Sequence, residues 1–190
     1  MSLVLFIRTK RRPMLVASAG MLAALALSAA APPTSASQKV STIEAKETVA
    51  PIVGGRTYWV RQLSTSRYAD AWNDAGHNFR METENWQNDT SQRWTATALG
   101  NNIYRFRQVS SQQYMDAYET GGNDFAMHTR PYQANNSQRW RAILVSDGVY
   151  RLQQVSTGQY MDAYEAGGYR MMTRTYQPNN SQRWRFLALP

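Results

Sequence analysis

The tetrapeptide Ser-Gln-Arg-Trp occurs three times in this chain, at residues 91–94, 137–140 and 181–184. Its tryptophans are 46 and then 44 residues apart, and a fixed spacing of this length indicates an internal structural repeat. The chain therefore holds three copies of one unit, each closed by the tetrapeptide. We place the copies at residues 56–100, 101–146 and 147–190.

The second and third copies are the most alike. Between residues 104–122 and residues 150–168, 14 of 19 positions are identical, which is far above chance similarity. An aspartate stands at the same place in every copy, and successive aspartates are 46 residues apart: Asp70, Asp116 and Asp162. The repeats therefore share a second fixed position upstream of the tryptophan.

Each copy is built of short segments in which polar and apolar residues alternate, such as Gln-Tyr-Met-Asp-Ala-Tyr at residues 113–118. Alternation with many aromatic residues is typical of half-buried strands, and Gly-Gly and Asn-Asn pairs mark the turns. Four short strands per copy predict an all-β body of twelve strands with pseudo-threefold symmetry. Three copies together can close a barrel and remove exposed strand edges. A propeller is the competing architecture, but three blades fall below the usual four.

The Gln-x-Trp triplets resemble the QxW motif of the ricin-type β-trefoil lectins, and the Tyr-Met-Asp-Ala strand resembles the Leu-Asp segment of that family. The resemblance covers residues 56–190 and implies a β-trefoil domain. In the family, the Gln and Trp of the motif are architectural. We therefore expect the tryptophans to fill the core and the amides to satisfy local backbone groups, at Gln92, Trp94, Gln138, Trp140, Gln182 and Trp184.

A sugar site needs a polar side chain for the hydroxyl groups and an aromatic ring for the apolar C–H face. Side chains at i and i+2 of a strand point to the same side, so each repeat offers an acid-plus-aromatic pair. The pairs are Asp116 with Tyr118, Asp162 with Tyr164, and Asp70 with Trp72. The resemblance implies that these aspartates accept sugar hydroxyls. The alternative is that each aspartate ends its strand and caps a turn.

Further contacts are expected from the third strand of each copy and from the loop before the QxW motif. The candidates are His128, Arg130 and Asn136 in copy two, and Arg174 and Asn180 in copy three. The sequence departs from the family at two places. Serine replaces the asparagine that precedes Gln, so we transfer the amide role to Asn136 and Asn180. Arginine replaces the stacking aromatic residue.

The arginines leave two alternatives open. In the first, the ring that stacks on the sugar comes from Tyr118 and Tyr164, or from Tyr132 and Tyr176 if the latter pair does not pack in the core. The arginines instead bind a carboxylate, sulfate or phosphate if the glycan is anionic. Copy one carries Glu84 at the arginine position, which predicts a different specificity or a dead site. We expect the sites to be best formed in copies two and three.

The first 55 residues differ from the repeats. Residues 8–12 read Arg-Thr-Lys-Arg-Arg, and an uncharged apolar run from Met14 to Ala31 follows. A basic head, an apolar middle and small residues before the cleavage point are the parts of a secretory signal. We predict that residues 1–31 are a signal peptide cleaved near Ala31, and that residues 32–55 are a disordered linker. The alternative is a membrane anchor, for which the apolar run is short.

Composition excludes several classes of protein. The absence of cysteine excludes disulfides, thiolate metal sites and cysteine nucleophiles. The net charge of +8 overstates the basicity of the repeats, since residues 56–190 hold 15 Arg, no Lys and 11 Asp or Glu. These arginines recur among acids in every copy, whereas a nucleic-acid site needs a clustered basic face. We expect no nucleic-acid partner.

Catalysis requires an asymmetric set of acid, base or nucleophile, but every candidate carboxylate here occurs in three equivalent copies. His77 and His128 stand at non-equivalent positions, which is neither a metal pattern nor a triad pattern. We predict a secreted, non-enzymatic, monomeric lectin-like module that binds glycans or polysaccharide and needs no cofactor or metal. The alternative is a trefoil acting through protein contacts, either as a protease inhibitor or as the cell-targeting subunit of a secreted toxin.

Overall fold

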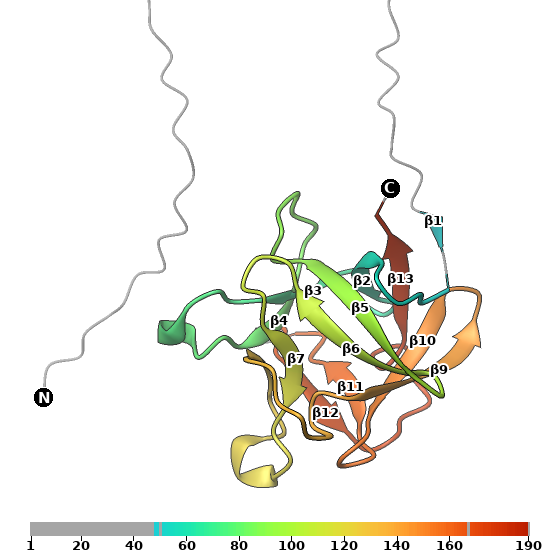
Figure 1. Ribbon diagram of the computed structural model, residues 1–190. Helices are drawn as coiled ribbons and strands as arrows, with labels where there is room; N and C mark the ends of the chain where they lie inside the picture. Colours follow the sequence, from blue (N-terminus) through green and yellow to red (C-terminus); the bar gives the residue numbers. More distant parts are fainter. Residues whose placement is uncertain (1–47, 50, 167, 190) are drawn as a thin grey trace, which may run out of the picture. The chain divides into compact units, whose positions relative to one another are not determined.

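The computed structural model describes residues 48–49, 51–166 and 168–189 of the chain. The predicted signal peptide and the first part of the predicted linker lie outside the described residues. Within those that are described, no helix combines the length and apolar character needed to cross a membrane. Figure 1 shows that strands make up almost all of the regular structure.

In the part of the chain that the structure describes, six longer strands form a closed antiparallel barrel. Each strand pairs with two neighbours, and the last returns to the first through the pair Arg185↔Arg61. Closure leaves these strands without a free edge, as expected from the repeat count. The barrel strands are β2 (Thr57–Gln62), β5 (Arg93–Gly100), β6 (Ile103–Gln108), β9 (Trp140–Ser146), β10 (Val149–Gln154) and β13 (Trp184–Ala188).

Three hairpins complete the repeats, one in each copy. They consist of β3 (Tyr68–Ala71) with β4 (Met81–Glu84), β7 (Tyr114–Ala117) with β8 (Met127–Arg130), and β11 (Tyr160–Ala163) with β12 (Met171–Arg174). Short 3-10 helices lie inside two of the hairpins, at Ala75–His77 (η1) and Gly121–Asn123 (η2). Twelve strands in three equivalent copies confirm the predicted all-β trefoil.

The hairpins meet one another in a ring. Single bridges join β4 to β8, β8 to β12 and β12 to β4, through Arg80↔His128, Ala126↔Met172 and Glu82↔Arg170. Backbone bonds repeat the same order, because the amides of Thr129, Thr173 and Thr83 each donate to a carbonyl in the preceding hairpin. The second strands of all three hairpins therefore converge on the pseudo-threefold axis.

The packed body begins earlier than the sequence suggested. Strand β1 (Thr48–Val49) pairs with β13 through Thr48↔Ala188, and Figure 1 shows it beside the C-terminal strand. Ile52 is buried in the core. The hydroxyl of Tyr58 accepts a bond from the Val53 amide at 2.7 Å and donates to the Pro51 carbonyl at 2.9 Å. Thr48–Val49 and Ile52, which lie within the linker expected over residues 32–55, therefore belong to the packed body.

The three motif tryptophans lie at the centre of the core. Trp94, Trp140 and Trp184 are fully buried, as predicted. Each indole N–H donates to a backbone carbonyl on the first hairpin strand of its own repeat, that of Ala69, Met115 or Met161, at 3.0–3.2 Å. A buried indole N–H needs such a partner. The tryptophan therefore fixes the strand that carries the aspartate.

A second set of glutamines, which the sequence analysis did not single out, joins neighbouring repeats. Gln62, Gln108 and Gln154 end strands β2, β6 and β10 and are fully buried. Each amide donates to two backbone carbonyls of the preceding repeat in the ring: Gln62 to Ala163 and Ser181, Gln108 to Ala71 and Ser91, and Gln154 to Ala117 and Ser137. Their oxygens accept from Thr65, Ser111 and Thr157.

Replacing Gln108 with alanine is expected to lower the free energy of unfolding by about 2 kcal/mol or more, because the buried carbonyls of Ala71 and Ser91 lose their donor. Urea unfolding of the variant and the wild type measures the difference. Gln153→Ala is the matched control, since its amide bond to the Gly158 carbonyl lies at the surface. Equal stability losses in the two variants would contradict a special role for the buried amide.

Candidate functional site

The motif glutamine connects the loop before the tryptophan to the aspartate of the same repeat. In copy two, Gln138 Oε1 accepts from the Gln133 amide at 2.8 Å. Its Nε2 donates to the Pro131 carbonyl at 2.9 Å and to Asp116 Oδ2 at 3.2 Å. Gln92 and Gln182 repeat this pattern with Asp70 at 3.5 Å and Asp162 at 3.3 Å. The expected satisfaction of local backbone groups is confirmed, and the same amide also orients the carboxylate.

The three aspartates lie inside the hairpin strands and are nearly covered. Asp70, Asp116 and Asp162 expose 8%, 3% and 1% of their surface. Burial raises the pKa of Asp70 to about 6 and also raises that of Asp116, because removal from water disfavours the charged form. The nearby side chains of Ser91 and Ser137 lower the two pKa values in part.

Copy two brings four of the predicted residues together. Asp116 lies opposite His128 in the register of β7 and β8. The ring of Tyr118 meets that of His128 edge to face, with 4.9 Å between centroids. The guanidinium of Arg130 lies 4.8 Å from the centroid of the Tyr118 ring. The group offers a carboxylate, a phenol, an imidazole and a cation within one hairpin.

Copy three has the same plan with one substitution. Arg174 lies 4.5 Å from the centroid of the Tyr164 ring, which matches the arginine–tyrosine contact of copy two. Met172 occupies the position opposite Asp162, where copy two has histidine. The Nε of Arg174 approaches the Met172 sulfur at 3.1 Å. Asp162 Oδ1 also accepts from the backbone amide of Ala163 at 2.7 Å, which holds this carboxylate in place.

Copy one is arranged differently. The His77 ring stacks on Trp72 at 3.8 Å between centroids, so it covers one face of the aromatic residue. His77 Nδ1 also contacts Asp74 at 2.8 Å, and this contact is the main cause of a lowered pKa for Asp74. The two glutamates of β4 are engaged by arginines, with Glu82 on Arg80 at 2.6 Å and Glu84 on Arg67 at 3.1 Å.

The two predicted amides are directed elsewhere. Asn136 Oδ1 accepts from Arg139 and Asn180 Oδ1 accepts from Arg183, both at 3.0 Å and at the surface. Among the described contacts, no hydrogen bond joins either amide to the aspartate of its repeat. Ser137 lies near enough to Asp116 to lower its pKa, and its hydroxyl donates to Asn135 Oδ1 at 2.9 Å. Sequence reasoning noted this serine as a departure from the family but did not place it in the site, although its repetition in every copy was the available signal.

The second candidate pair of tyrosines does not pack in the core. Tyr132 and Tyr176 are 57% and 55% exposed, and Trp86 stands exposed at the equivalent place in copy one. Tyr132 meets Tyr114 edge to face at 5.6 Å and lies 4.8 Å from the Arg105 guanidinium. These rings therefore present apolar surface on the loop that follows each hairpin.

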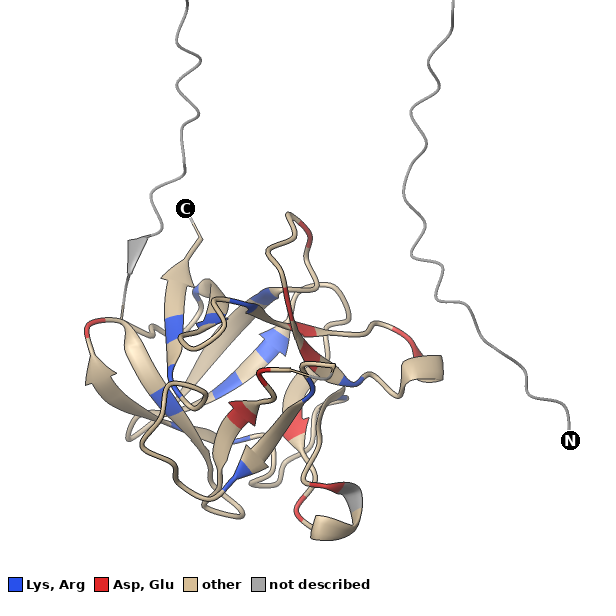
Figure 2. Ribbon diagram, turned by 180° about the vertical axis from the view of Figure 1, so that it is seen from behind, with Lys and Arg blue, Asp and Glu red and all other residues tan. Residues whose placement is uncertain are grey.

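Charged residues are interspersed over the fold. Figure 2 shows arginines on barrel strands and at hairpin ends, with acidic residues between them on hairpins and turns. Among the described residues, no group of three or more His, Cys, Asp or Glu side chains is arranged to hold a metal ion.

The comparison with protein families agrees with this geometry. Residues 48–134 and 136–189 match the ricin-type beta-trefoil lectin domain-like family. The chain belongs to this family. Membership supports carbohydrate binding at the level of the family, whose lectin modules are not themselves enzymes. A comparison with curated proteins finds no match.

Solved structures show the same trefoil at low sequence identity. The designed threefold-symmetric protein ThreeFoil superposes with a TM-score of 0.63 and 19% identity, over 70% of this chain and 99% of that one. The Macrolepiota procera ricin B-like lectin, solved in complex with lactose, gives 0.61 and 15% over 72% and 98%. An exo-β-1,3-galactanase from Clostridium thermocellum gives 0.65 and 15% over 73% of this chain and 31% of that one. These likenesses show the fold.

The raised pKa of Asp70 predicts a pH-dependent stability. Between its ordinary value of 3.8 and about 6, the folded trefoil binds more protons than the unfolded chain, so its free energy of unfolding falls as pH rises through that window. Asp70→Asn removes the buried charge. The variant is expected to exceed the wild type by about 2–3 kcal/mol above pH 6 and to match it near pH 3.

Urea unfolding over this pH range measures the effect. Asp147→Asn is the control, because Asp147 is exposed in the turn between β9 and β10 and its replacement is expected to change stability by less than about 0.5 kcal/mol. An Asp70→Asn advantage that did not vary with pH would contradict the assignment of a costly buried carboxylate.

Proposed function

We propose that this protein is a secreted lectin whose working sugar sites lie on the second and third hairpins. The observation that carries the proposal is the repeated group of a buried aspartate, an arginine-backed tyrosine and a motif glutamine, present in copies two and three. Each aspartate is held by an amide that also fixes the adjacent loop, which preorganises it for a ligand.

The chemistry of the group suits a saccharide. Asp116 and Asp162 would accept bonds from sugar hydroxyls, and Tyr118 and Tyr164 would cover the apolar C–H face. Arg130 and Arg174 lie over these rings and would use their remaining N–H groups on sugar oxygens. Family members solved with a bound sugar, such as the lactose complex of the Macrolepiota lectin, support this class of ligand.

Copy one is proposed to bind weakly or not at all. His77 occupies one face of Trp72, and the glutamates of β4 are paired with arginines. Two sites on one rigid body gain by avidity on dense glycans, which offsets the weakness of single shallow sites. Binding without catalysis agrees with the threefold repetition of every candidate carboxylate. Secretion rests on the signal peptide that the sequence predicts at residues 1–31.

The test is a glycan array probed with the full chain and with the double variant Asp116→Asn, Asp162→Asn. Loss of two charged acceptors is expected to weaken binding by about 10-fold or more, since a hydrogen bond to a charged group contributes about 1.5–3 kcal/mol. Asn keeps the shape of Asp, so the motif glutamines retain an oxygen partner and the fold is expected to persist. Circular dichroism checks that it does.

Asp147→Asn serves as the matched control for the change of charge, because this residue lies in an exposed turn of the barrel. Retention of binding by the control and loss by the double variant supports the assigned sites. Binding that survives in the folded double variant would move the sites elsewhere on the trefoil. Failure of the wild type to bind any glycan would remove the lectin function itself.

A further inference from the structure

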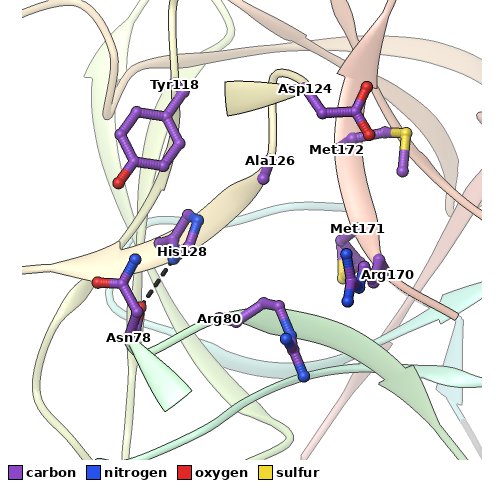
Figure 3. Close-up of a pocket in the computed structure, with 9 residues that line it drawn as sticks. All are labelled: Asn78, Arg80, Tyr118, Asp124, Ala126, His128, Arg170, Met171 and Met172. Atoms are coloured by element: carbon purple, nitrogen blue, oxygen red, sulfur yellow. Dashed lines mark hydrogen bonds between the residues drawn. The ribbon is translucent and has the colours of Figure 1, made fainter. Parts of the chain in front are cut away.

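A pocket lies where the three hairpins meet, and all three copies line it. Its volume is about 260 Å³. Figure 3 shows Tyr118 and His128 on one side and Met172 and Arg170 on the other, with Arg80 below them. This volume falls just under the range of about 300–1,000 Å³ that is usual for drug-sized ligands, so one sugar unit would fill the pocket and the rest of a longer chain would lie outside it.

The pocket exists because one copy breaks the symmetry. Arg80, Ala126 and Arg170 stand at equivalent positions of the repeats, 46 and 44 residues apart. All three take part in the ring of bridges that joins the hairpins. Copies one and three fill this position with a long side chain, whereas Ala126 stops at its methyl group. The space next to Ala126 is therefore left open between two arginines.

The charges that face this space are mixed but lean positive. Two guanidinium groups line the pocket, against the single carboxylate of Asp124. Arg80 is already paired with Glu82 at 2.6 Å. Arg170 is exposed, and the described contacts of its side chain include no hydrogen bond or ion pair. Arg170 is therefore the cation available to an anionic group.

His128 supplies an acceptor on the opposite side. Its Nδ1 lies 2.7 Å from the Asn78 carbonyl, which can only accept, so the proton sits on Nδ1. Figure 3 shows the second ring nitrogen on the other edge of the ring, toward Ala126. Burial lowers the pKa of His128, and Arg130 and Arg80 add to this effect, so the ring stays neutral at pH 7. The second nitrogen can therefore accept a hydrogen bond from a hydroxyl group.

These partners together favour one class of ligand. A fully ionised inorganic anion would meet Arg170 but would leave the acceptors of His128 and Asp124 without a donor. A neutral sugar would satisfy His128 and Asp124 with its hydroxyls but would leave the charge of Arg170 without a counter-ion. A sugar that carries a carboxylate offers both an anion and several hydroxyl donors, and it matches the whole lining.

We propose that the pocket beside Ala126 binds a carboxylated sugar unit, with the carboxylate on Arg170 and hydroxyl groups on His128 and Asp124. This inference rests on the proposed lectin function, because Tyr118 and His128 belong both to the copy-two site and to the pocket. The pocket thereby gives copy two a specificity for acidic glycans that copy three lacks.

The experiment uses isothermal titration of the full chain with uronic acid oligosaccharides and with their methyl esters, which keep the hydroxyls and lose the charge. The wild type is expected to bind the acids about 10-fold more tightly than the esters, as one charge-assisted contact implies. Arg170→Gln is expected to abolish this preference, so that the variant binds the acids and the esters equally within about twofold.

Ala126→Arg separates the pocket from general electrostatic attraction. It restores the residue type of the other two copies and fills the space while it raises the net charge. The pocket proposal requires the acid preference to fall in this variant, whereas non-specific attraction would make it rise. Arg141→Gln, at an exposed position of the barrel strand β9, removes one charge elsewhere and is expected to keep the preference.

The outcomes distinguish the two proposals. Equal binding of acids and esters by the wild type, or an acid preference that survives Arg170→Gln, overturns the pocket assignment and leaves the lectin function standing. Tighter binding of sulfated oligosaccharides than of uronic acids overturns the choice of a carboxylate. Absence of binding to every member of the panel overturns both the pocket and the lectin function.

Discussion

A buried amide must find hydrogen-bond partners, and in this protein the barrel glutamines find them in another copy of the repeat. Gln62, Gln108 and Gln154 each hold two carbonyls of the neighbouring repeat. One carbonyl follows the site aspartate, and the other precedes the motif glutamine. Each copy therefore holds the two backbone segments that carry the aspartate and the motif glutamine of its neighbour. The motif tryptophans and glutamines add hydrogen bonds within each repeat, which hold the strand of the aspartate and the loop before the motif.

These hydrogen bonds keep the aspartates in buried surroundings, which disfavour the charged form of a carboxylate. Asp70 and Asp116 accept hydrogen bonds from glutamine amides, yet burial still raises their pKa. Groups held at a cost to stability are frequent at functional sites, because selection for binding maintains them. A different feature, the side chain that contacts the aromatic residue, distinguishes copies two and three from copy one. The aromatic partner is backed by arginine in copies two and three and by histidine in copy one.

Features with a period were accessible from the sequence. The Ser-Gln-Arg-Trp tetrapeptide and the aspartates predicted the trefoil, the buried tryptophans and the amides that pin the loops. The expectation that Asp116 and Tyr118 point to the same side followed from the two-residue period of a strand. The sequence did not predict the hydrogen-bond partner of either asparagine, because Asn136 can reach Arg139 as well as the candidate site. The early start of the packed body at Thr48 was also missed, since a two-residue strand has no pattern.

The symmetry of the repeat could locate equivalent residues but not the place where they meet. Alignment of the copies sets Arg80, Ala126 and Arg170 in one column, yet their convergence is a property of the ring of hairpins. The smaller residue of copy two leaves a cavity because the equivalent residues of the three copies meet at the pseudo-threefold axis. Specific chemistry at that axis therefore arises from divergence between copies, whereas the fold arises from their likeness.

Thr48 pairs with Ala188, so the beginning and the end of the packed body lie side by side. The glutamine contacts also run around the body in a cycle, from each copy to the one before it. The three repeats therefore form a closed cycle, and the packed body begins and ends at one of the three equivalent junctions between them. A circular permutant that begins at the turn near Asp147, with Ala188 linked to Thr48, would therefore form the same trefoil.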